Sequence, residues 1–182
     1  MRRLNRLMPD LPNPKKQSPS LKARALRLLS QREHSRAELA KKLADYLRLN
    51  AKEGQGEAKP HQQCNTDPVI PREEQIAAVL DDFERRGWLS DVRYAEALVR
   101  RRSERYGLRK IQDELQRAGV GLDQSKLLLE DLKKTEFQRA KELWDRKFGT
   151  LAVDQKERAK QYRFLVSKGF NPEIVARVIG GR

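Results

Sequence analysis

The feature that most constrains the fold is an internal repeat. The segment from Ala25 to Leu43 aligns with the segment from Ala97 to Leu115, so that Ala25 matches Ala97 and Leu43 matches Leu115. The matched positions are mostly those that shape a pair of helices. Short repeated units of this kind cannot bury their apolar faces alone, and they therefore stack on their neighbours.

A second internal match places a glycine turn in two of the repeats. The segment 114–129 aligns with the segment 164–179, which pairs Leu115 with Leu165 and Gly119 with Gly169. A leucine four residues before a glycine is typical of a helix that ends in a left-handed turn, where the next apolar residue covers the helix end. We interpret both glycines as turn residues rather than phosphate-binding ones, because a P-loop needs a preceding strand and a lysine.

Apolar residues elsewhere recur at spacings of three and four, which indicates amphipathic helices, and no strand alternation is convincing. Ser35 with Glu38, Ser90 or Asp91, Asp123, and Asn171 before Pro172 are candidate helix starts. The predicted helices are 21–32, 35–49, 73–86, 91–105, 108–118, 123–132, 135–147, 155–168 and 172–180.

These helices predict an all-α fold, an elongated and curved array of three tandem three-helix repeats. The repeats span 21–86, 91–132 and 135–180. A basic, proline-rich tail at 1–20 and a polar stretch with glycines and prolines at 50–71 resist helix formation. We expect the tail to be flexible and the second stretch to be a flexible insertion in the first repeat.

The charge of the chain points to a polyanionic partner. Forty Lys and Arg residues against 26 Asp and Glu give a net charge of +14, and 36% of all residues are charged. Such an excess raises the local concentration of polyanions, and nucleic acid or a complex containing it is the leading candidate. The alternative is that the charge serves solubility alone.

The chain is poorly equipped for catalysis or metal binding. The two histidines, His34 and His61, lie in different segments, and the single cysteine, Cys64, falls in the insertion, without a rigid partner for a nucleophile. Asp81 and Asp82 point about 100° apart on a helix, which makes a solvated edge a better interpretation than an acid/base pair. We therefore expect no catalytic residue, metal, cofactor or enzymatic activity.

The strongest candidate binding segment is RRSERYGLRK, from Arg101 to Lys110, where five cations lie within ten residues and Arg100 directly precedes them. Arg101 and Arg105 are predicted to share a helix face, and arginine suits phosphate or carboxylate contacts. Favourable interaction with the helix dipole is the alternative explanation, but it needs one or two cations rather than this many. The candidate partner-binding or DNA-binding residues are Arg100, Arg101, Arg102, Arg105, Tyr106, Arg109 and Lys110, extended on the eighth helix by Arg158, Lys160, Arg163 and Lys168.

Large aromatic residues form a second set that is able to stack on bases. Because each lies at a helix joint or on an apolar stripe, we expect most of them to be core residues instead, with Trp88 wedged into the joint between the first two repeats. This set comprises Trp88, Trp144, Phe148, Phe164 and Phe170.

Three sequence blocks resemble the RecX family of bacterial recombination regulators. They are LLSQREHSRAELAKKL, then RRGWLSDVRYAEALVRRRSERYGLRKIQDELQRAGV, and finally KFG with YRFLVSKGFNPEIVARVI. The similarity runs in order from about residue 21 to residue 180, and the insertion and the tail depart from it.

The resemblance implies a regulator of DNA repair and recombination, linked to the SOS response, that works without catalysis. It would bind the RecA filament on single-stranded DNA, lodge in its groove and suppress strand exchange, ATP hydrolysis and coprotease activity. It also implies three tandem three-helix repeats. The alternative function is a free-standing basic DNA-binding protein that acts without RecA.

We expect the protein to be cytoplasmic and monomeric. No apolar run approaches the length of about 20 residues that spans a bilayer, and no signal-peptide pattern follows the start. The single cysteine excludes an intramolecular disulfide and favours a reducing compartment.

Overall fold

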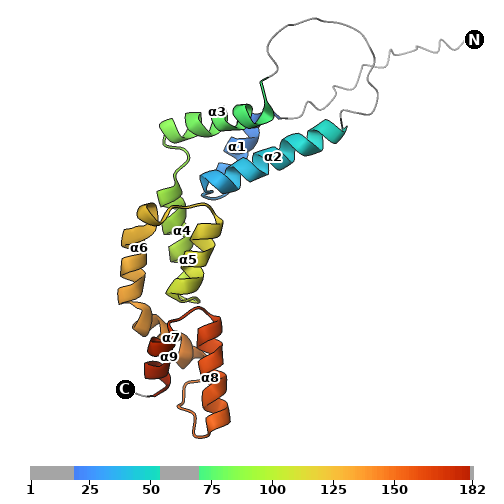
Figure 1. The fold of residues 1–182 in the computed structure, drawn as a ribbon. Coiled ribbons are helices and arrows are strands. Elements are labelled where there is room, and N and C mark those ends of the chain that lie inside the picture. Colours follow the sequence, from blue (N-terminus) through green and yellow to red (C-terminus); the bar gives the residue numbers. More distant parts are fainter. Residues whose placement is uncertain (1–18, 54–69, 181–182) are drawn as a thin grey trace, which may run out of the picture.

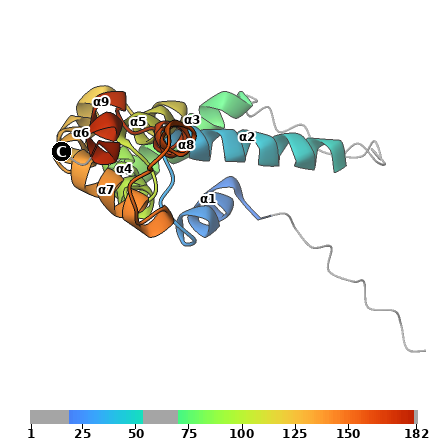
Figure 2. The ribbon, with the colours of Figure 1, turned by 90° about the horizontal axis from the view of Figure 1, so that it is seen from below.

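The computed structural model describes residues 19–53 and 70–180, and within these ranges the chain is all helix and connecting turns. The helices are α1 (Leu21–Leu29), α2 (Arg36–Glu53), α3 (Arg72–Arg85), α4 (Asp91–Arg102), α5 (Leu108–Arg117), α6 (Leu122–Lys134), α7 (Glu136–Lys147), α8 (Gln155–Ser167) and α9 (Pro172–Ile179). They form an elongated array, as predicted (Figure 1). Helices α2 and α3 run across the long axis, and α2 projects to one side in the view along that axis (Figure 2).

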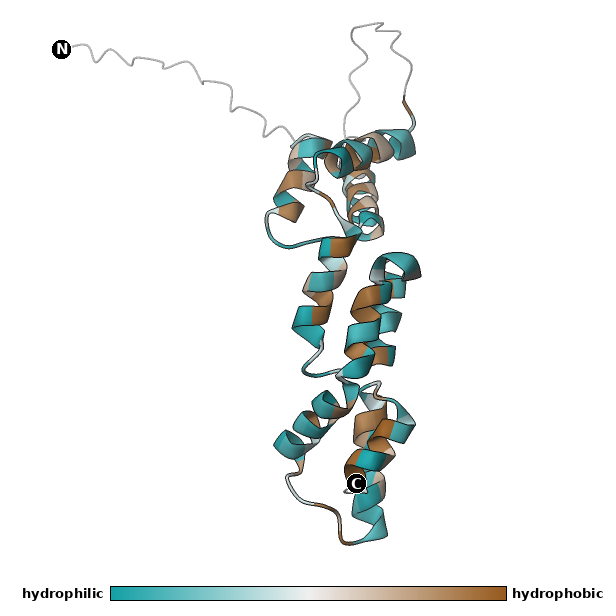
Figure 3. Cartoon of the chain, turned by 90° about the vertical axis from the view of Figure 1, so that its left-hand side faces the viewer, coloured by the Kyte–Doolittle hydropathy of each residue, from teal (hydrophilic) through white to brown (hydrophobic). Residues whose placement is uncertain are grey.

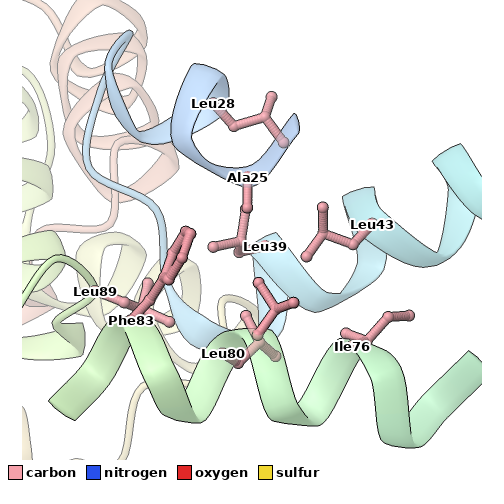
Figure 4. Packing of buried hydrophobic residues seen from close by; sticks show 9 residues of the cluster. Ala25, Leu28, Leu39, Leu43, Ile76, Leu80, Phe83 and Leu89 are labelled. Atoms are coloured by element: carbon pink, nitrogen blue, oxygen red, sulfur yellow. The ribbon is translucent and has the colours of Figure 1, made fainter. Parts of the chain in front are cut away.

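The helices pack in three groups of three, each around its own core. Hydrophobic residues lie on the helices of all three groups (Figure 3), and each group has its own cluster of buried apolar side chains. The first core joins residues of α1, α2 and α3 (Figure 4). Among the larger helix–helix contacts, only the one between the consecutive helices α6 and α7 joins two different groups. The fully or nearly buried core residues include Leu39, Leu43 and Phe83 in the first repeat, Ala95, Ile111 and Leu115 in the second, and Ala140, Leu165 and Val175 in the third.

Most predicted helix starts are confirmed by side-chain caps. The Ser90 hydroxyl accepts from the amide of Arg93, and the Asn171 side chain accepts from the amide of Glu173 at 2.8 Å. The prediction of a start at Asp123 was wrong by one residue, because Gly121 is the cap and α6 begins at Leu122.

The boundary of the insertion also differs from the prediction. Helix α2 continues through Asn50 to Glu53, since Ala51, Lys52 and Glu53 are good helix formers that extend the turn pattern. The rest of the insertion, with His61 and Cys64, and nearly all of the tail lie outside the described residues.

The two turn glycines are confirmed. Gly119 and Gly169 have φ angles of +74° and +86°, a region that favours glycine. The amide of Val120 donates to the carbonyl of Leu115 at 3.1 Å, which is the closing bond expected for such a turn. The same arrangement closes α3 at Gly87, whose φ is +70°.

Asp81 lies on an exposed edge of α3, as expected, while Asp82 is half-buried, and both form ion pairs. As helix geometry requires, they diverge: Asp81 pairs with Arg36 of α2 at 2.6 Å, and Asp82 pairs with Lys22 of α1 at 3.1 Å and with Arg86. Side-chain hydrogen bonds from Arg86 and Lys22 lower the pKa of Asp82. The two carboxylates therefore tether α3 to both other helices of its repeat.

The joint between the first and second repeats is polar. The Ser35 hydroxyl donates to the carbonyl of Ala118 at 2.6 Å, and the amide of Arg36 donates to the Asp91 carboxylate at 2.7 Å. The Arg93 guanidinium pairs with Glu33 at 3.0 Å. Hydrogen bonds and an ion pair near the ends of helices thus hold the first repeat on the second.

A buried histidine next to this joint predicts a pH effect on stability. His34 is buried, its Nδ1 lies 3.1 Å from Glu38 Oε2, and burial lowers its pKa below 6.5 more than Glu38 raises it. Since the unfolded chain then binds the proton more readily, the stabilising contribution is complete above pH 6.5 and declines as the pH falls through the lower folded-state value.

We expect the thermal midpoint to fall more steeply below that pH in the natural chain than in His34→Gln. Differential scanning calorimetry across the acidic range measures both chains. Parallel pH profiles for the two proteins would contradict this role of His34, because His61 is common to both.

No helix of the described part is long and apolar enough to span a membrane.

Candidate polyanion-binding surface

The segment from Arg101 to Lys110 forms the end of α4, a turn and the start of α5. Helix α4 ends at Arg102, so the predicted helix to residue 105 was wrong, and Arg105 does not share a helical face with Arg101. Contacts from the third repeat hold the turn that follows α4. Its Arg139 guanidinium donates to the carbonyls of Ser103 and Tyr106, at 2.9 and 2.8 Å, and the Gly107 amide donates to the third repeat rather than back along α4.

The second and third repeats meet at this turn. The Gly107 amide donates to the carbonyl of Lys168 at 3.0 Å. One carboxylate oxygen of Glu136, a residue that is 2% exposed, accepts from the amides of Leu108 and Asn171 at 3.2 Å each. This carboxylate joins the N-termini of α5 and α9, where negative charge is favourable.

Three cations surround the ring of Tyr106, and we call these four residues the Tyr106 cluster. The Nζ atom of Lys110 lies 4.8 Å from the ring centre, Arg102 Cζ lies 5.4 Å away, and Lys168 Nζ lies 5.5 Å away. Lys168 comes from the end of α8, so the fold brings together predicted residues that are more than 60 positions apart in the sequence.

The predicted cations differ in their ion pairing. Arg102 pairs with Glu114 at 3.0 Å, which partly neutralises it. Within residues 19–53 and 70–180, no carboxylate pairs with the remaining cations of the segment. These unpaired cations are Arg100, Arg101, Arg105, Arg109 and Lys110.

Arg101 and Arg105 each line a groove at one joint of the array, whereas Arg109 and Lys110 line a smaller groove together with Asp113 and Glu114. The Arg101 groove, of about 630 Å³, lies between the first and second repeats. Its cations are Arg32, Lys41, Arg101, Arg102 and Arg117, and its anions are Glu38 and Glu114.

The second groove, which we call the Lys168 groove, has a volume of about 500 Å³ and lies between the second and third repeats. Its lining consists of Glu104, Arg105, Tyr106, Leu143, Arg146, Lys147, Phe164 and Lys168. Arg101 and Arg105 thus serve different grooves, one at each joint of the array.

Only one of the four predicted cations of α8 joins these clusters. Lys168 contacts Tyr106, whereas Lys160 pairs with Glu157 at 3.2 Å. Arg158 and Arg163 are exposed and line neither groove, since residues at these spacings point in different directions around a helix.

The sequence analysis missed several cations that line the two grooves. Arg117 lies seven residues after Lys110 on α5, a spacing that places both on one helix face and offers a usable signal. Arg146 and Lys147, at the end of α7, carry no such signal, because their place in the Lys168 groove depends on contacts between repeats.

The aromatic residues divide between core and surface. Trp144 and Phe170 are buried, as expected, while Phe148 and Phe164 are half-buried and pack edge to face at 5.4 Å. Trp88 departs from the prediction of a wedge in the joint. It is 44% exposed and packs edge-on against Phe83 at 5.3 Å, because the bend after Gly87 leaves one side of its ring in solvent.

The described part of the chain contains no group of three or more His, Cys, Asp or Glu residues able to hold a metal ion. The arrangement suits electrostatic binding: arginines and lysines converge on two grooves, and aromatic rings hold several of them.

Comparison with known proteins links this arrangement to one family. Residues 90–123 match the family model for the second three-helix domain of RecX, and residues 134–179 match the model for its third three-helix domain. The chain is 44% identical over 160 residues to the regulatory protein RecX of Leptothrix cholodnii, covering 88% of this chain and 87% of that protein. It is 41% identical over 162 residues to the regulatory protein RecX of Ralstonia nicotianae, covering 89% and 87%.

A solved structure shows the same fold. The crystal structure of RecX from Lactobacillus salivarius superposes with a TM-score of 0.62, at 18% identity, over 88% of this chain and 93% of that one. Given the identity to its relatives over most of its length, the chain belongs to the RecX family of regulatory proteins.

Proposed function

We propose that the chain binds the RecA filament on single-stranded DNA and inhibits its recombinase, ATPase and coprotease activities without catalysing a reaction. The observation that carries this proposal is the identity, over nearly the whole chain, with proteins named as regulatory protein RecX. The elongated form and the unpaired cations at both joints support it, because a filament presents a repeating, negatively charged surface to such a molecule.

Inhibition in this proposal follows from occupancy. An elongated array with a basic groove at each joint contacts successive positions along a polymer at once, and linked contacts of this kind raise overall affinity. The bound chain then blocks access to the filament. The alternative, a free-standing DNA-binding protein, is favoured by the net charge of +14 alone.

A binding comparison at matched ionic strength separates the two functions. We expect the chain to bind RecA-coated oligothymidylate more tightly than the naked oligonucleotide, measured by fluorescence anisotropy. Tighter binding to the naked strand would favour the free-standing DNA-binding protein. Both series are measured at the same salt concentrations, because phosphate contacts are strongly salt-dependent.

A charge reversal tests the predicted segment. Arg101→Glu with Arg105→Glu changes both grooves, and we expect at least about a tenfold weaker inhibition of filament ATP hydrolysis, because one cation in each groove becomes repulsive. The helix content, followed by circular dichroism, stays unchanged.

The matched control is Lys126→Glu with Lys141→Glu, which produces the same change in net charge at exposed positions outside both grooves. Equal inhibition by the two double variants would remove Arg101 and Arg105 from the site.

A further inference from the structure

The Lys168 groove is built where the ends of three helices meet. Arg105 follows α4, Arg146 and Lys147 occupy the last turn of α7, and Lys168 is the C-cap of α8. Arg146 donates to the carbonyl of Glu104 at 2.7 Å, which fixes α7 against the turn after α4. The groove therefore has a defined shape that depends on both repeats.

Two aromatic rings hold the lysines of this groove in place. Lys168 Nζ lies 5.5 Å from the ring centre of Tyr106 and also 5.5 Å from that of Phe164. Lys147 Nζ lies 5.9 Å from the Phe164 ring. Each such contact contributes about 0.5–1 kcal/mol at an exposed site and reduces the freedom that a lysine would otherwise lose on binding an anion.

The groove lacks the anions that would neutralise it. Its four cations face a single carboxylate, that of Glu104, which gives a net charge of +3, and within the described ranges none of the four forms an ion pair. The helix dipoles offset part of this charge, at about half a unit for each of three C-terminal ends. A clear positive excess remains, so compensation of the dipoles does not account for all the cations.

We propose that the Lys168 groove binds the phosphate backbone of single-stranded nucleic acid, with Tyr106 and Phe164 positioning Lys147 and Lys168 toward the phosphates. Its role in regulation rests on the function proposed above. Lys147 and Lys168 already cover faces of the Tyr106 and Phe164 rings, so a base has less room to stack there. This arrangement favours recognition of phosphates over recognition of bases. The core of a protein interface is depleted in lysine and rich in apolar surface, whereas this groove offers Leu143 as its single aliphatic side chain.

The test is direct binding of the full chain to fluorescein-labelled oligothymidylate over a range of salt concentrations. Lys147→Gln with Lys168→Gln removes two phosphate contacts. We expect the slope of log affinity against log salt to become shallower by about 1.4, which is twice the value of about 0.7 for one contact to a single strand. A strand of abasic deoxyribose phosphate should bind nearly as well as oligothymidylate.

Two controls accompany this test. Lys126→Gln with Lys141→Gln makes the same charge change outside the groove and should leave the slope unchanged, and Lys147→Arg with Lys168→Arg should retain binding. Phe164→Leu keeps every charge and should still weaken oligothymidylate binding, because Lys147 and Lys168 lose the ring that orients them. Circular dichroism and thermal unfolding verify that each variant is folded.

Three outcomes would overturn the phosphate site: an unchanged salt slope in the glutamine variant, a large loss of affinity for the abasic strand, or normal oligothymidylate binding combined with lost binding to the RecA filament. The last outcome would make the groove a protein contact and leave the proposed function standing. The converse result is also possible to recognise. If the glutamine variant loses oligothymidylate binding and the natural chain shows no preference for the RecA-coated strand, the groove is supported and the proposed function is contradicted.

Discussion

Gly107→Ala should destabilise the joint between the second and third repeats by about 3 kcal/mol or more. A Cβ atom at this position would lie 2.3 Å from the carbonyl oxygen of Gly169 and 2.3 Å from the amide nitrogen of Phe170. Both are backbone atoms, so no side-chain rotation relieves the overlap, and overpacking a rigid site costs about 1–3 kcal/mol or more. Urea unfolding followed by the fluorescence of buried Trp144 measures the change.

Gly121→Ala is the matched control. Gly121 is also a helix N-cap with an extended backbone and no side-chain cap, but a Cβ there would meet only the Gln124 side chain, at 3.7 Å. Both variants carry the same small cost of alanine at an N-cap, and their difference isolates the backbone overlap. Equal free energies of unfolding for the two variants would show that the repeats are not in close contact at Gly107.

Arg139→Met should cost about 3 kcal/mol of unfolding free energy. The Arg139 guanidinium donates to the carbonyls of Ser103, Tyr106 and Leu132 at 2.8 to 2.9 Å, and burial lowers its pKa. Methionine fills most of the space but leaves the carbonyls of Ser103 and Tyr106 without this donor, and each buried polar group without a partner costs about 1–3 kcal/mol. Chemical denaturation again provides the measurement.

Two further variants sharpen the result for Arg139. Arg139→Lys should recover less than half of the loss, since a single ammonium lacks the planar fork that reaches carbonyls on different sides. Arg85→Met changes an arginine whose side chain is 77% exposed and should stay within about 0.5 kcal/mol of the natural chain. Full stability of Arg139→Met would show that these hydrogen bonds do not hold the joint.

The helices and their turns could be predicted because their signals are local. Ser90 and Asn171 cap the helices that begin after them, and Gly119 and Gly169 form left-handed turns, as the sequence indicated. Each of these features depends on neighbours within one or two helical turns. An internal repeat match and a capping residue are therefore sufficient to predict where a helix begins or ends.

The joints and the grouping of cations could not be predicted, because they depend on residues far apart in the chain. In the sequence, Glu136 looks like an ordinary acidic residue at a helix start. In the structure it is buried, and its carboxylate accepts hydrogen bonds from amides 28 and 35 positions away. Similarly, the pattern around Arg105 continues a helix in the sequence, whereas in the structure α4 ends at Arg102 and the following turn is held by Arg139 of the third repeat. The sequence showed that the segment from Arg101 to Lys110 is basic, but which cations share a groove follows from how the repeats meet.

The open end of the first repeat has a consequence for how chains of this kind can vary in length. The C-terminal end of α2 and the N-terminal end of α3, which flank residues 54–69, lie at the outer edge of the molecule, far from both joints (Figure 1). Adding or removing residues between these two ends changes loop-closure entropy by only a few tenths of a kcal/mol for a modest change in length. Related chains can therefore differ in length between α2 and α3 while both grooves keep their geometry.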